Sequence, residues 1–421
     1  MLTAVVGINW GDEGKGRMVD LLSADYDIVC RYQGGNNAGH TVINDHGKIV
    51  LNLLPSGISR EGTVNVMGNG MVIDLEHLVR EIQSLREKGI HIGPDNLKIS
   101  DKAVICLPWH KMQDIMEEDR LKDKKFGSTR RGIGPVYADK YMKKAVRMGD
   151  LFAPDKLPEK VADLTEWKNL TVRGYGHEPV KAEDILAWLH EFGDPIKPYI
   201  TDVSDYLYDA AAAGENIMFE AQLGALRDIE FGIYPYTSSS CTLAGYAPIG
   251  AGIPGLKLDK TIGIMKAYSS CVGEGPFTVE MFGDEAEALR RAGGEYGAAT
   301  GRPRRVGAFD VPASRYGVRM HGADCVALTK LDVLSYMEKI PVCVAYDING
   351  EITEKFPVGE RLNAAKPVFE YMDGFGDISG CRKPEDLPKA AMDYIRYLEA
   401  AVGCKIKYVS VGAGRDEYVE L

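Results

Sequence analysis

The sequence lacks the marks of several protein classes. Its eight cysteines and eight histidines include no C-x-x-C and no H-x₃-H spacing, so a structural zinc site is not expected. No apolar stretch approaches the roughly 18 residues that a membrane-spanning helix needs, so no membrane association is expected. The chain also lacks a basic excess, because 50 lysines and arginines stand against 61 acidic residues, a net charge of −11. That balance argues against a general nucleic-acid-binding protein, which presents a basic face.

Two further absences bear on where the protein works. The cysteines are scattered, several of them in apolar runs such as "CVALTKL" and "PVCVAY", which predicts reduced core residues. The first apolar run, "LTAVV", stops at Asn9 and has no basic segment before it, so it indicates a strand and not a signal peptide. We therefore expect a cytoplasmic protein.

Apolar and amphipathic segments alternate along the chain. Continuous apolar runs such as "NIMFE", "KTIGIMKAYS" and "IPVCVAYDI" are typical of strands covered on both faces, as in parallel sheets. Stretches such as "EHLVREIQSLREKG" and "LPKAAMDYIRYLEAAVG" predict helices between them. The alternation predicts an α/β fold, with one large domain over residues 1–421 around a mostly parallel central sheet. Residues from about 101 to 210 are more helical and more charged, and we expect them to form a helical insertion.

The stretch "GINWGDEGKGR", residues 7–17, follows the first predicted strand and precedes a predicted helix. Its glycines and Lys15 suit a phosphate-binding loop, although Gly16 stands where the common P-loop has Ser or Thr. A carboxylate beside a triphosphate needs a metal or a substrate proton to neutralise it. Asp12 is therefore a candidate Mg²⁺ ligand, general base, or both. The alternative interpretation is a tight turn with solvent-exposed charges.

Two more glycine-rich stretches offer polar groups. "RYQGGNNAGHT", residues 31–41, presents Asn36, Asn37 and His40 directly after a predicted strand, and an imidazole there can donate to a phosphoryl oxygen. "FGSTRRGIGP", residues 126–135, combines hydroxyls, arginines and glycines that suit a second phosphate. A structural histidine and a solvated basic loop are the respective alternatives.

The last two stretches point to a carboxylate and to a base. "GAATGRPRRVG", residues 297–307, clusters three arginines between glycines, and guanidinium groups match carboxylates and phosphates bidentately. An ordinary surface loop is the alternative. "LTKLD", residues 328–332, closes a predicted strand. Its Asp332 carboxylate can accept the N1–H and N2–H₂ donors of guanine, which adenine lacks, while Lys330 lies along the base.

Taken together, these motifs resemble those of adenylosuccinate synthetases. The resemblance runs from the first strand to "VSVGAGRDE" and includes, in order, "WGDEGKG", "QGGNNAGHT", "RRGIGP", "YPYTSSS", "KAYSSCVGEGPF", "TGRPRR" and "TKLD". It implies a single-domain α/β homodimer with active sites shared between subunits, which joins IMP to L-aspartate in purine biosynthesis. In that reaction GTP, with Mg²⁺, phosphorylates O6 of IMP, and the aspartate amine then displaces phosphate from C6.

The resemblance also implies roles for individual residues. Asp12 would remove the N1 proton of IMP and, with the Gly39 carbonyl, hold one Mg²⁺ per subunit, while His40 would stabilise the phosphoryl group in transfer. The residues implied to bind GTP are Gly11, Asp12, Glu13, Gly14, Lys15, Gly16, Arg17, Gly39, His40, Thr41, Arg304, Lys330, Leu331, Asp332, Ser410, Val411 and Gly412. Those implied to bind IMP are Asp12, Glu13, Gly14, Lys15, Asn37, Ala38, Gly39, His40, Thr129, Lys143, Gln222, Leu223, Ser238 and Arg302. Those implied to close over aspartate are Ala298, Ala299, Thr300, Gly301, Arg302, Pro303 and Arg304.

Several positions depart from the family pattern. Arg130 stands where a glycine is usual, and Lys143 stands where an arginine commonly reaches the IMP phosphate of the neighbouring subunit. Leu223 occupies the place of an expected glutamine, with Gln222 one residue early. A sister ligase that acts on another 6-oxopurine nucleotide is therefore one alternative. The other is a GTP-dependent switch without a second substrate.

Overall fold

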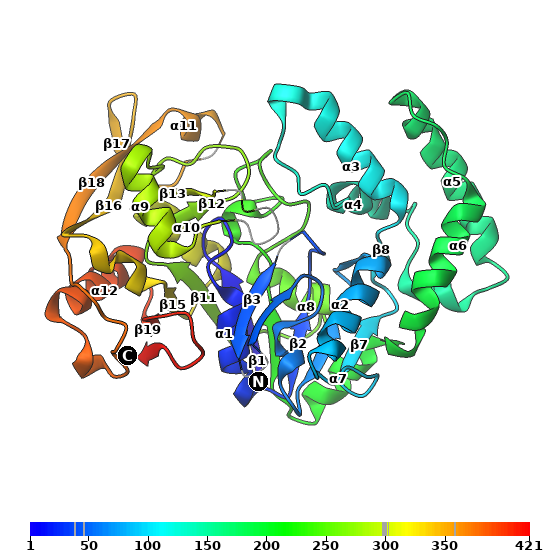
Figure 1. Cartoon of the computed structure of the whole chain (residues 1–421), viewed down its shortest axis with the longest axis horizontal. Helices are drawn as coiled ribbons and strands as arrows, with labels where there is room; N and C mark the ends of the chain where they lie inside the picture. The colour runs from blue at the N-terminus through cyan, green and yellow to red at the C-terminus, as the bar shows by residue number, and fades with distance from the viewer. Residues whose placement is uncertain (38, 45–46, 297–300, 302, 358) are drawn as a thin grey trace.

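The central element of the computed structural model is a ten-stranded sheet with the order β20-β19-β15-β11-β1-β10-β2-β5-β7-β9 (Figure 1). The structure describes residues 1–37, 39–44, 47–296, 301, 303–357 and 359–421. The strands of this sheet are β1 (Leu2–Gly7), β2 (Ile28–Arg31), β5 (Val64–Met67), β7 (Leu97–Ser100), β9 (Ile200–Thr201), β10 (Ile217–Glu220), β11 (Lys260–Lys266), β15 (Cys325–Thr329), β19 (Ile406–Ser410) and β20 (Tyr418–Glu420).

The sheet is parallel except at one edge, where β20 pairs antiparallel with β19. The predicted α/β fold with a mostly parallel sheet is therefore confirmed. The helices are α1 (Lys15–Leu22), α2 (Leu75–Glu87), α3 (Pro108–Leu121), α4 (Ile133–Tyr141), α5 (Leu157–Gly174), α6 (Ala182–Gly193), α7 (Val203–Ala212), α8 (Ala247–Ala251), α9 (Gly283–Gly293), α10 (Val311–His321), α11 (Glu360–Asn363) and α12 (Lys389–Val402).

Both faces of the sheet are covered because alternate side chains of each strand point to opposite sides. In β1, Val5 packs with Met18 and Val19 of α1 on one face. Its neighbours Ala4 and Val6 pack on the other face with side chains of α7 and α8. On that second face α10 and α12 cover β15 and β19, while α2 packs against β5 and β7 on the side of α1. This double coverage explains why the strands are nearly all apolar.

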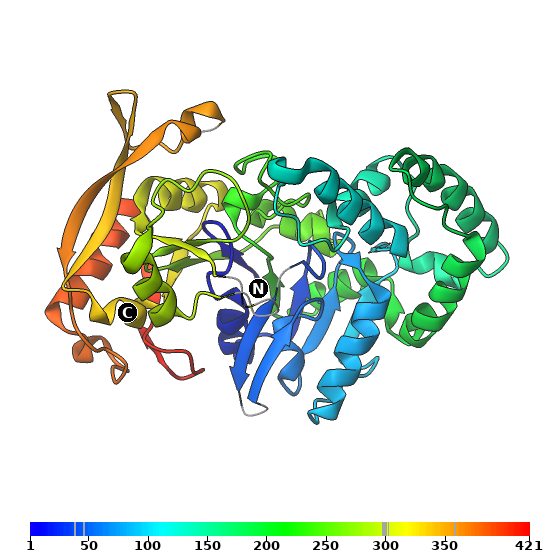
Figure 2. The same cartoon turned by 45° about the horizontal axis from the view of Figure 1, so that its top comes forward.

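Smaller sheets surround the central one. β3 (His40–Asn44) and β4 (Gly47–Leu51) form a hairpin, β6 (Val72–Ile73) pairs with β8 (Val104–Ile105), and β12 (Ser269–Cys271) pairs with β13 (Arg305–Gly307). A four-stranded sheet at one end of the molecule joins β14 (Phe309–Asp310), β16 (Lys339–Ile348), β17 (Glu351–Thr353) and β18 (Ala365–Asp373). Figure 2 shows this sheet at the opposite end from α3–α6.

One local prediction needs correction. The run "IPVCVAYDI" forms β16 of the four-stranded sheet and pairs antiparallel with β17 and β18, because an apolar run alone does not fix which sheet a strand joins. Near the insertion, the helix α4 ends at Tyr141, and Lys143 has a left-handed φ of 64° that no α-helix continues through.

The region from about 101 to 210 is largely helical, as expected, and its helices α3–α6 lie beside β7 at one end of the central sheet (Figures 1 and 2). That this region forms an insertion within a single domain stays a prediction. The eight cysteines are free, and seven of them are buried, as predicted from their apolar surroundings. Among the described residues, no helix is long and apolar enough to cross a membrane.

Candidate active site

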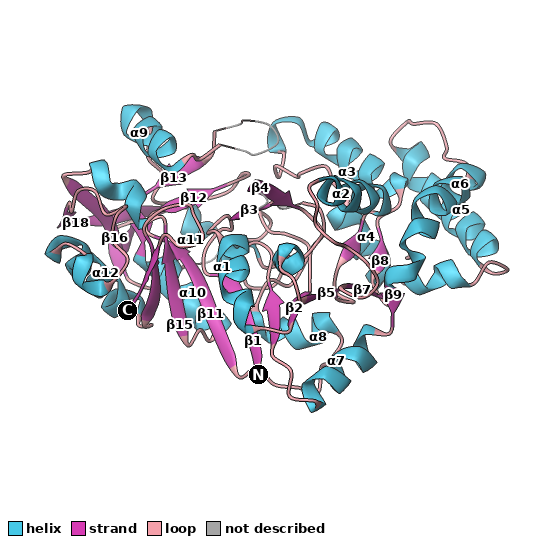
Figure 3. Ribbon diagram, turned by 60° about the horizontal axis from the view of Figure 1, so that its bottom comes forward, coloured by secondary structure: helices cyan, strands magenta, loops and turns pink. Residues whose placement is uncertain are grey.

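The motifs of the sequence converge at one edge of the central sheet. Three of the five motifs, residues 7–17, 31–41 and 328–332, follow β1, β2 and β15, while residues 222–223 and 410–412 follow β10 and β19. With β11 these strands form an uninterrupted run of neighbours in the sheet. Because these strands are parallel, their carboxyl ends lie at the same edge, where open α/β sheets bind ligands (Figure 3). Segments as distant as residues 7–17 and 410–412 are thereby brought into one site.

The first loop, residues 7–17, contains a carboxylate that serves the loop itself. Glu13 is 2% exposed, and its Oε1 accepts the backbone N–H of Asn9 at 3.1 Å and of Gly11 at 2.8 Å. Its Oε2 accepts from Lys15 Nζ at 2.6 Å. The side chain of Glu13 thus stabilises the loop and binds Lys15. A ligand contact predicted for this residue would therefore involve its backbone.

Asp12 is the carboxylate of this loop that remains accessible. Its side chain is 29% exposed, and its Oδ2 lies 3.2 Å from Arg304 Nε. The backbone of Asp12 has a left-handed φ of 59°, between Gly11 and the α1 N-cap Gly14, which are also left-handed. This turn directs the chain into the amino terminus of α1, whose free N–H groups favour an anion.

His40 lies against the same helix start. A Cβ added to Gly16 would meet the Cβ of His40 at 2.6 Å, so only glycine at position 16 allows this approach. His40 is 7% exposed, and its Nδ1 lies 2.5 Å from Oε1 of the fully buried Glu220. Ser56 holds that carboxylate from the other side, with its N–H donating at 2.7 Å and its hydroxyl at 2.5 Å.

The charges of this pair follow from its surroundings. Burial lowers the pKa of His40, against the raising effect of Glu220. Burial alone would raise the pKa of Glu220, but His40, Arg31 and the Ser56 hydroxyl outweigh it and lower the pKa. The favoured state is therefore a neutral imidazole that donates its Nδ1–H to an ionised Glu220. The Nε2 atom is left for a ligand.

The motif at residues 328–332 places a carboxylate with an unused acceptor. Asp332 Oδ1 is buried and has no hydrogen-bond partner among the residues that the structure describes; the same holds for the hydroxyl of Ser335. Burial raises the pKa of Asp332, opposed by the charges of Arg17 and Lys330. A buried acceptor without a donor is costly in a ligand-free protein, and the paired N–H groups of guanine match it.

Neighbouring residues close this base site from the C-terminal side. Arg17 donates to the hydroxyl of Ser410 and to the carbonyls of Gly414 at 2.6 Å and Glu417 at 3.0 Å. Ser410 in turn donates to the carbonyl of Gly412 at 3.0 Å. Two further predicted GTP contacts, Leu331 and Val411, are fully buried, so their side chains pack in the core.

A third group of predicted residues surrounds the second loop, residues 31–41. The side-chain amide of Gln222 donates to the carbonyl of Gly35 at 2.6 Å and accepts from its N–H at 3.1 Å, so it is already used by this loop. Asn37 accepts from Gly35 N–H at 3.2 Å, and the Ser238 hydroxyl lies 3.1 Å from that of Ser240. Contacts of these side chains with IMP stay predictions.

Leu223 borders the first loop, residues 7–17. Its backbone has a left-handed φ of 62°, and a Cβ added to Gly11 would lie 3.3 Å from its Cα. An apolar side chain therefore stands beside the first loop where the family pattern has an amide. Arg130, which replaces a family glycine, likewise has a glycine-like φ of 59°.

Some predicted residues lie at the rim or outside the described part. Thr41, Thr129, Gly39 and Lys143 are exposed. Pro303 and Gly301 are exposed near the base of the predicted aspartate loop, where Tyr296 bridges to Pro303. Ala38, Ala298, Ala299, Thr300 and Arg302 lie outside the described residues.

Sequence reasoning missed two buried glutamates, Glu220 and Glu295. Glu220 ends the apolar strand "NIMFE", and a charge at the end of such a strand was the available signal. Glu295 accepts from Lys266, Lys330 and Arg304 and carries no recognisable motif of its own.

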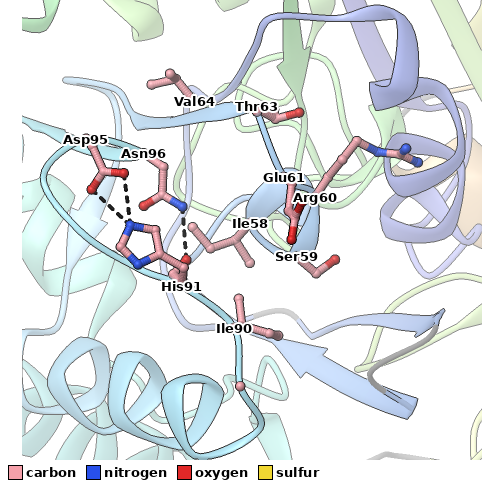
Figure 4. Close-up of a pocket in the computed structure, with 12 residues that line it drawn as sticks. Ile58, Ser59, Arg60, Glu61, Thr63, Val64, Ile90, His91, Asp95 and Asn96 are labelled. Carbon is pink, nitrogen blue, oxygen red and sulfur yellow. Dashed lines mark hydrogen bonds and ion pairs between the residues drawn. The ribbon is translucent and has the colours of Figure 1, made fainter.

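A surface pocket on another part of the molecule does not compete with this site. It lies between residues 58–64 and 89–96, at the amino ends of β5 and β7 and thus at the opposite edge of the sheet (Figure 4). Some of its polar groups pair with each other: His91 Nε2 lies 2.9 Å from Asp95, and the Asn96 amide donates to the His91 carbonyl at 2.9 Å. Among the described residues, no group of three or more potential metal-ligating side chains is found.

The fold and the site together define an α/β protein whose sheet edge joins a glycine-rich loop at a helix start to a buried carboxylate with an unused acceptor. A sequence model of adenylosuccinate synthetase matches residues 4–419. The chain belongs to the adenylosuccinate synthetase family.

Individual relatives agree with this assignment. The adenylosuccinate synthetase of Caldanaerobacter subterraneus subsp. tengcongensis is 44% identical over 423 residues, covering 100% of this chain and 99% of the relative. That of Streptococcus gordonii is 42% identical, covering 98% and 96%. The structure of the fully ligated Plasmodium falciparum enzyme superposes with a TM-score of 0.92 at 35% identity, covering 100% and 99%. The succinoaminodeoxyadenylate synthetase of cyanophage S-2L, at 18% identity and a TM-score of 0.62, shares the fold.

Proposed function

We propose that this protein joins IMP to L-aspartate with the transfer of the γ-phosphoryl group of GTP to O6 of IMP, and so forms adenylosuccinate, GDP and phosphate. The observation that carries the proposal is the convergence of a phosphate-binding loop, an accessible Asp12, the His40–Glu220 pair and the Asp332 base site at one sheet edge. A GTP switch needs the loop and the base site, but it does not need an accessible Asp12 that is paired with Arg304.

The roles of the residues follow from their positions. Asp12 removes the N1 proton of IMP, which raises the negative charge on O6 and makes it a nucleophile for the γ-phosphorus of GTP. Lys15 and the amino terminus of α1 bind phosphate oxygens. His40 faces the phosphoryl group with Nε2, and the incoming negative charge favours a proton on that atom. Phosphate then leaves as the aspartate amine attacks C6.

The oxygens of Asp12 and of the Gly39 carbonyl suit Mg²⁺, which prefers oxygen ligands and keeps water or substrate oxygens as well. Asp12 is the carboxylate of the loop that is free for this purpose, because Glu13 is buried and bonded to backbone N–H groups. When bound, the ion neutralises charge on the transferring phosphoryl group.

An ultraviolet absorbance assay tests the proposal, together with a phosphate assay. Phosphate release from GTP should require IMP and aspartate together, and omission of either should reduce it to background. GTP hydrolysis at an unchanged rate without the two co-substrates would contradict the ligase and favour a switch.

Leu223 favours a second candidate, a ligase for a related 6-oxopurine nucleotide. The side chain stands beside Gly11 and next to Asp12 in space, where an amide is expected to read the purine edge. A competition assay with IMP, GMP and their deoxy forms separates the candidates: IMP should have the highest kcat/KM. A higher value for another nucleotide would reassign the substrate and keep the reaction type.

We also propose that the protein acts as a homodimer. Lys143 is exposed at a left-handed turn after α4, and the family resemblance predicts that this position reaches the IMP phosphate of the neighbouring subunit. Size-exclusion chromatography with light scattering, with and without IMP and GDP, tests this directly. A monomer under all conditions would exclude a shared site.

A further inference from the structure

Glu295 is a buried carboxylate that binds three cations. It is 0% exposed and follows α9. Its Oε1 accepts from Lys266 Nζ at 2.8 Å and from Lys330 Nζ at 3.0 Å. Its Oε2 accepts from Arg304 Nη1 at 2.9 Å. The hydroxyl of Tyr268 also donates to Oε1.

Two of these cations belong to different parts of the proposed active site. Lys330 is the lysine of the base-reading motif, and it is held from a second side by the carbonyl of Gly293 at 2.6 Å. Arg304 reaches Asp12, with its Nε 3.2 Å from Oδ2. One carboxylate therefore stands between the guanine side of the site and the catalytic aspartate.

The backbone makes the same connection. Arg304 N–H donates to the carbonyl of Glu295 at 2.9 Å, and Tyr296 bridges to Pro303. Glu295 therefore holds Arg304 twice, through its main-chain carbonyl and through its carboxylate. A displacement of Glu295 moves both the backbone and the guanidinium of Arg304.

The electrostatics make the link strong. Burial would raise the pKa of Glu295, but Lys266, Lys330 and Arg304 outweigh it and hold the pKa far below the usual range. Burial lowers the pKa of Lys266, and Glu295 opposes this. Removing the negative charge of Glu295 leaves three cations close together in a buried region, where water screens their repulsion only weakly.

We propose that Glu295 is a positioning residue that couples guanine recognition at Lys330 to the placement of Arg304, a predicted aspartate contact, beside Asp12. Lys330 binds one oxygen of the carboxylate, Oε1, and Arg304 binds the other, Oε2. A change in the hydrogen bond from Lys330 therefore shifts the carboxylate and, with it, Arg304. The inference rests on the proposed function and extends it, because it makes aspartate binding depend on the base of the GTP.

The test compares Glu295→Gln with Glu280→Gln as a matched control. Glu280 pairs with Arg305, the residue after Arg304, at 2.5 Å. Among the described residues it forms no ion pair with Lys330 or Arg304. In Glu295→Gln the KM values for GTP and aspartate should both rise about tenfold, while the KM for IMP stays within about twofold. Glu280→Gln should leave all three within about twofold.

A coupling experiment separates positioning from general loosening of the fold. Lys330→Met should raise the KM for aspartate several-fold even at saturating GTP, and in the Glu295→Gln background it should raise it no further. Glu295→Asp, which keeps the charge but shortens the reach, should restore the melting temperature without restoring the aspartate KM. Effects that simply multiply in the double variant would overturn the proposal.

Two further outcomes stay distinguishable. If Glu295→Gln does not fold, the cycle of Lys330→Met with Arg304→Lys still tests the link, and independent effects would refute it. If the wild-type protein forms no product, the proposed function fails by itself. Titration with a fluorescent GDP analogue then tests the coupling: Arg304→Ala should weaken binding in the wild-type background but not with Glu295→Gln, and equal weakening in both would overturn it.

Discussion

Replacing Glu220 by glutamine is a sharp test of the phosphoryl-transfer site. The substitution keeps the size of a fully buried side chain and removes the charge that His40 Nδ1 faces at 2.5 Å. It also creates a conflict, because Ser56 N–H donates to Oε2 at 2.7 Å and the hydroxyl donates to Oε1. An amide either turns its NH₂ toward the Ser56 N–H or turns it toward His40, where it forces the imidazole into the other tautomer.

The magnitude follows from the interaction that is lost. A buried hydrogen bond between His40 and an ionised carboxylate is about 2 kcal/mol stronger than one between His40 and a neutral amide. The negative charge of Glu220 supports a positive imidazole, and that state is needed most when phosphoryl charge develops in the transition state. About 2 kcal/mol of lost transition-state stabilisation corresponds to a roughly 30-fold lower kcat.

The assay measures kcat and the GTP KM across pH, with Ser56→Ala as the control. Ser56→Ala removes a donor to the same carboxylate and keeps the charge, so kcat should fall less than about fivefold. Glu220→Gln should lower kcat with little change in KM, and ¹⁵N NMR of the imidazole should show a changed tautomer for His40. An unchanged kcat, or a loss confined to KM, would refute the role of Glu220 in supporting His40.

Three other changes test separate parts of the molecule. Asp332→Asn should reduce the preference for GTP over ATP, measured as the ratio of kcat/KM values, by roughly a hundredfold, because the amide no longer accepts both guanine donors; an unchanged ratio would remove Asp332 from the base site. Mixing inactive Lys143→Ala and Asp12→Asn proteins should restore up to about a quarter of wild-type activity if sites are shared, since half of the random dimers then contain one intact site, and no recovery would contradict sharing. Burial raises the pKa of Asp310 from 3.8 to about 6, so the folded protein holds this proton more tightly than the unfolded chain, and the stability it contributes below pH 4 is lost as the pH rises through 6. At 1.36 kcal/mol per pKa unit the loss is about 3 kcal/mol, and Asp310→Asn should therefore gain melting temperature relative to the wild type between pH 4 and 7; a constant difference would show that the carboxyl does not titrate there.

The fold and the ligand-facing motifs were predictable because their signals are local. Apolar runs that end in glycine-rich segments mark strands that lead into loops, and a parallel sheet places the ends of those strands at one edge. The role of Asp332 was predicted in this way, because the motif that suggests it includes only the four residues that precede Asp332 in the sequence. The assignment of β16 to the central sheet failed because strand pairing is decided by distant partners.

The supporting shell was not predictable in the same way. Glu220 acts on His40 across 180 residues, and Glu295 acts on Lys330 across 35, so neither pair leaves a spacing that a sequence pattern records. Glu13 has a role in the loop that the sequence did not indicate. Its carboxylate accepts from two backbone N–H groups and from Lys15, while the predicted ligand contact of this residue stays a prediction.

Backbone conformation explains why the site also departs from residue preferences. Asp12, Leu223 and Lys330 have left-handed φ values of 59°, 62° and 59°, a region that favours glycine and costs other residues about 1–2 kcal/mol each. All three directly follow or face strand ends at the site, where the side chain is needed and glycine cannot serve. A neighbouring residue is glycine instead. Gly11 leaves room for the backbone of Leu223, because a Cβ on Gly11 would lie 3.3 Å from the Leu223 Cα. Gly11 is thus required as much by the strained backbone of Leu223 as by the phosphate that the loop is expected to bind.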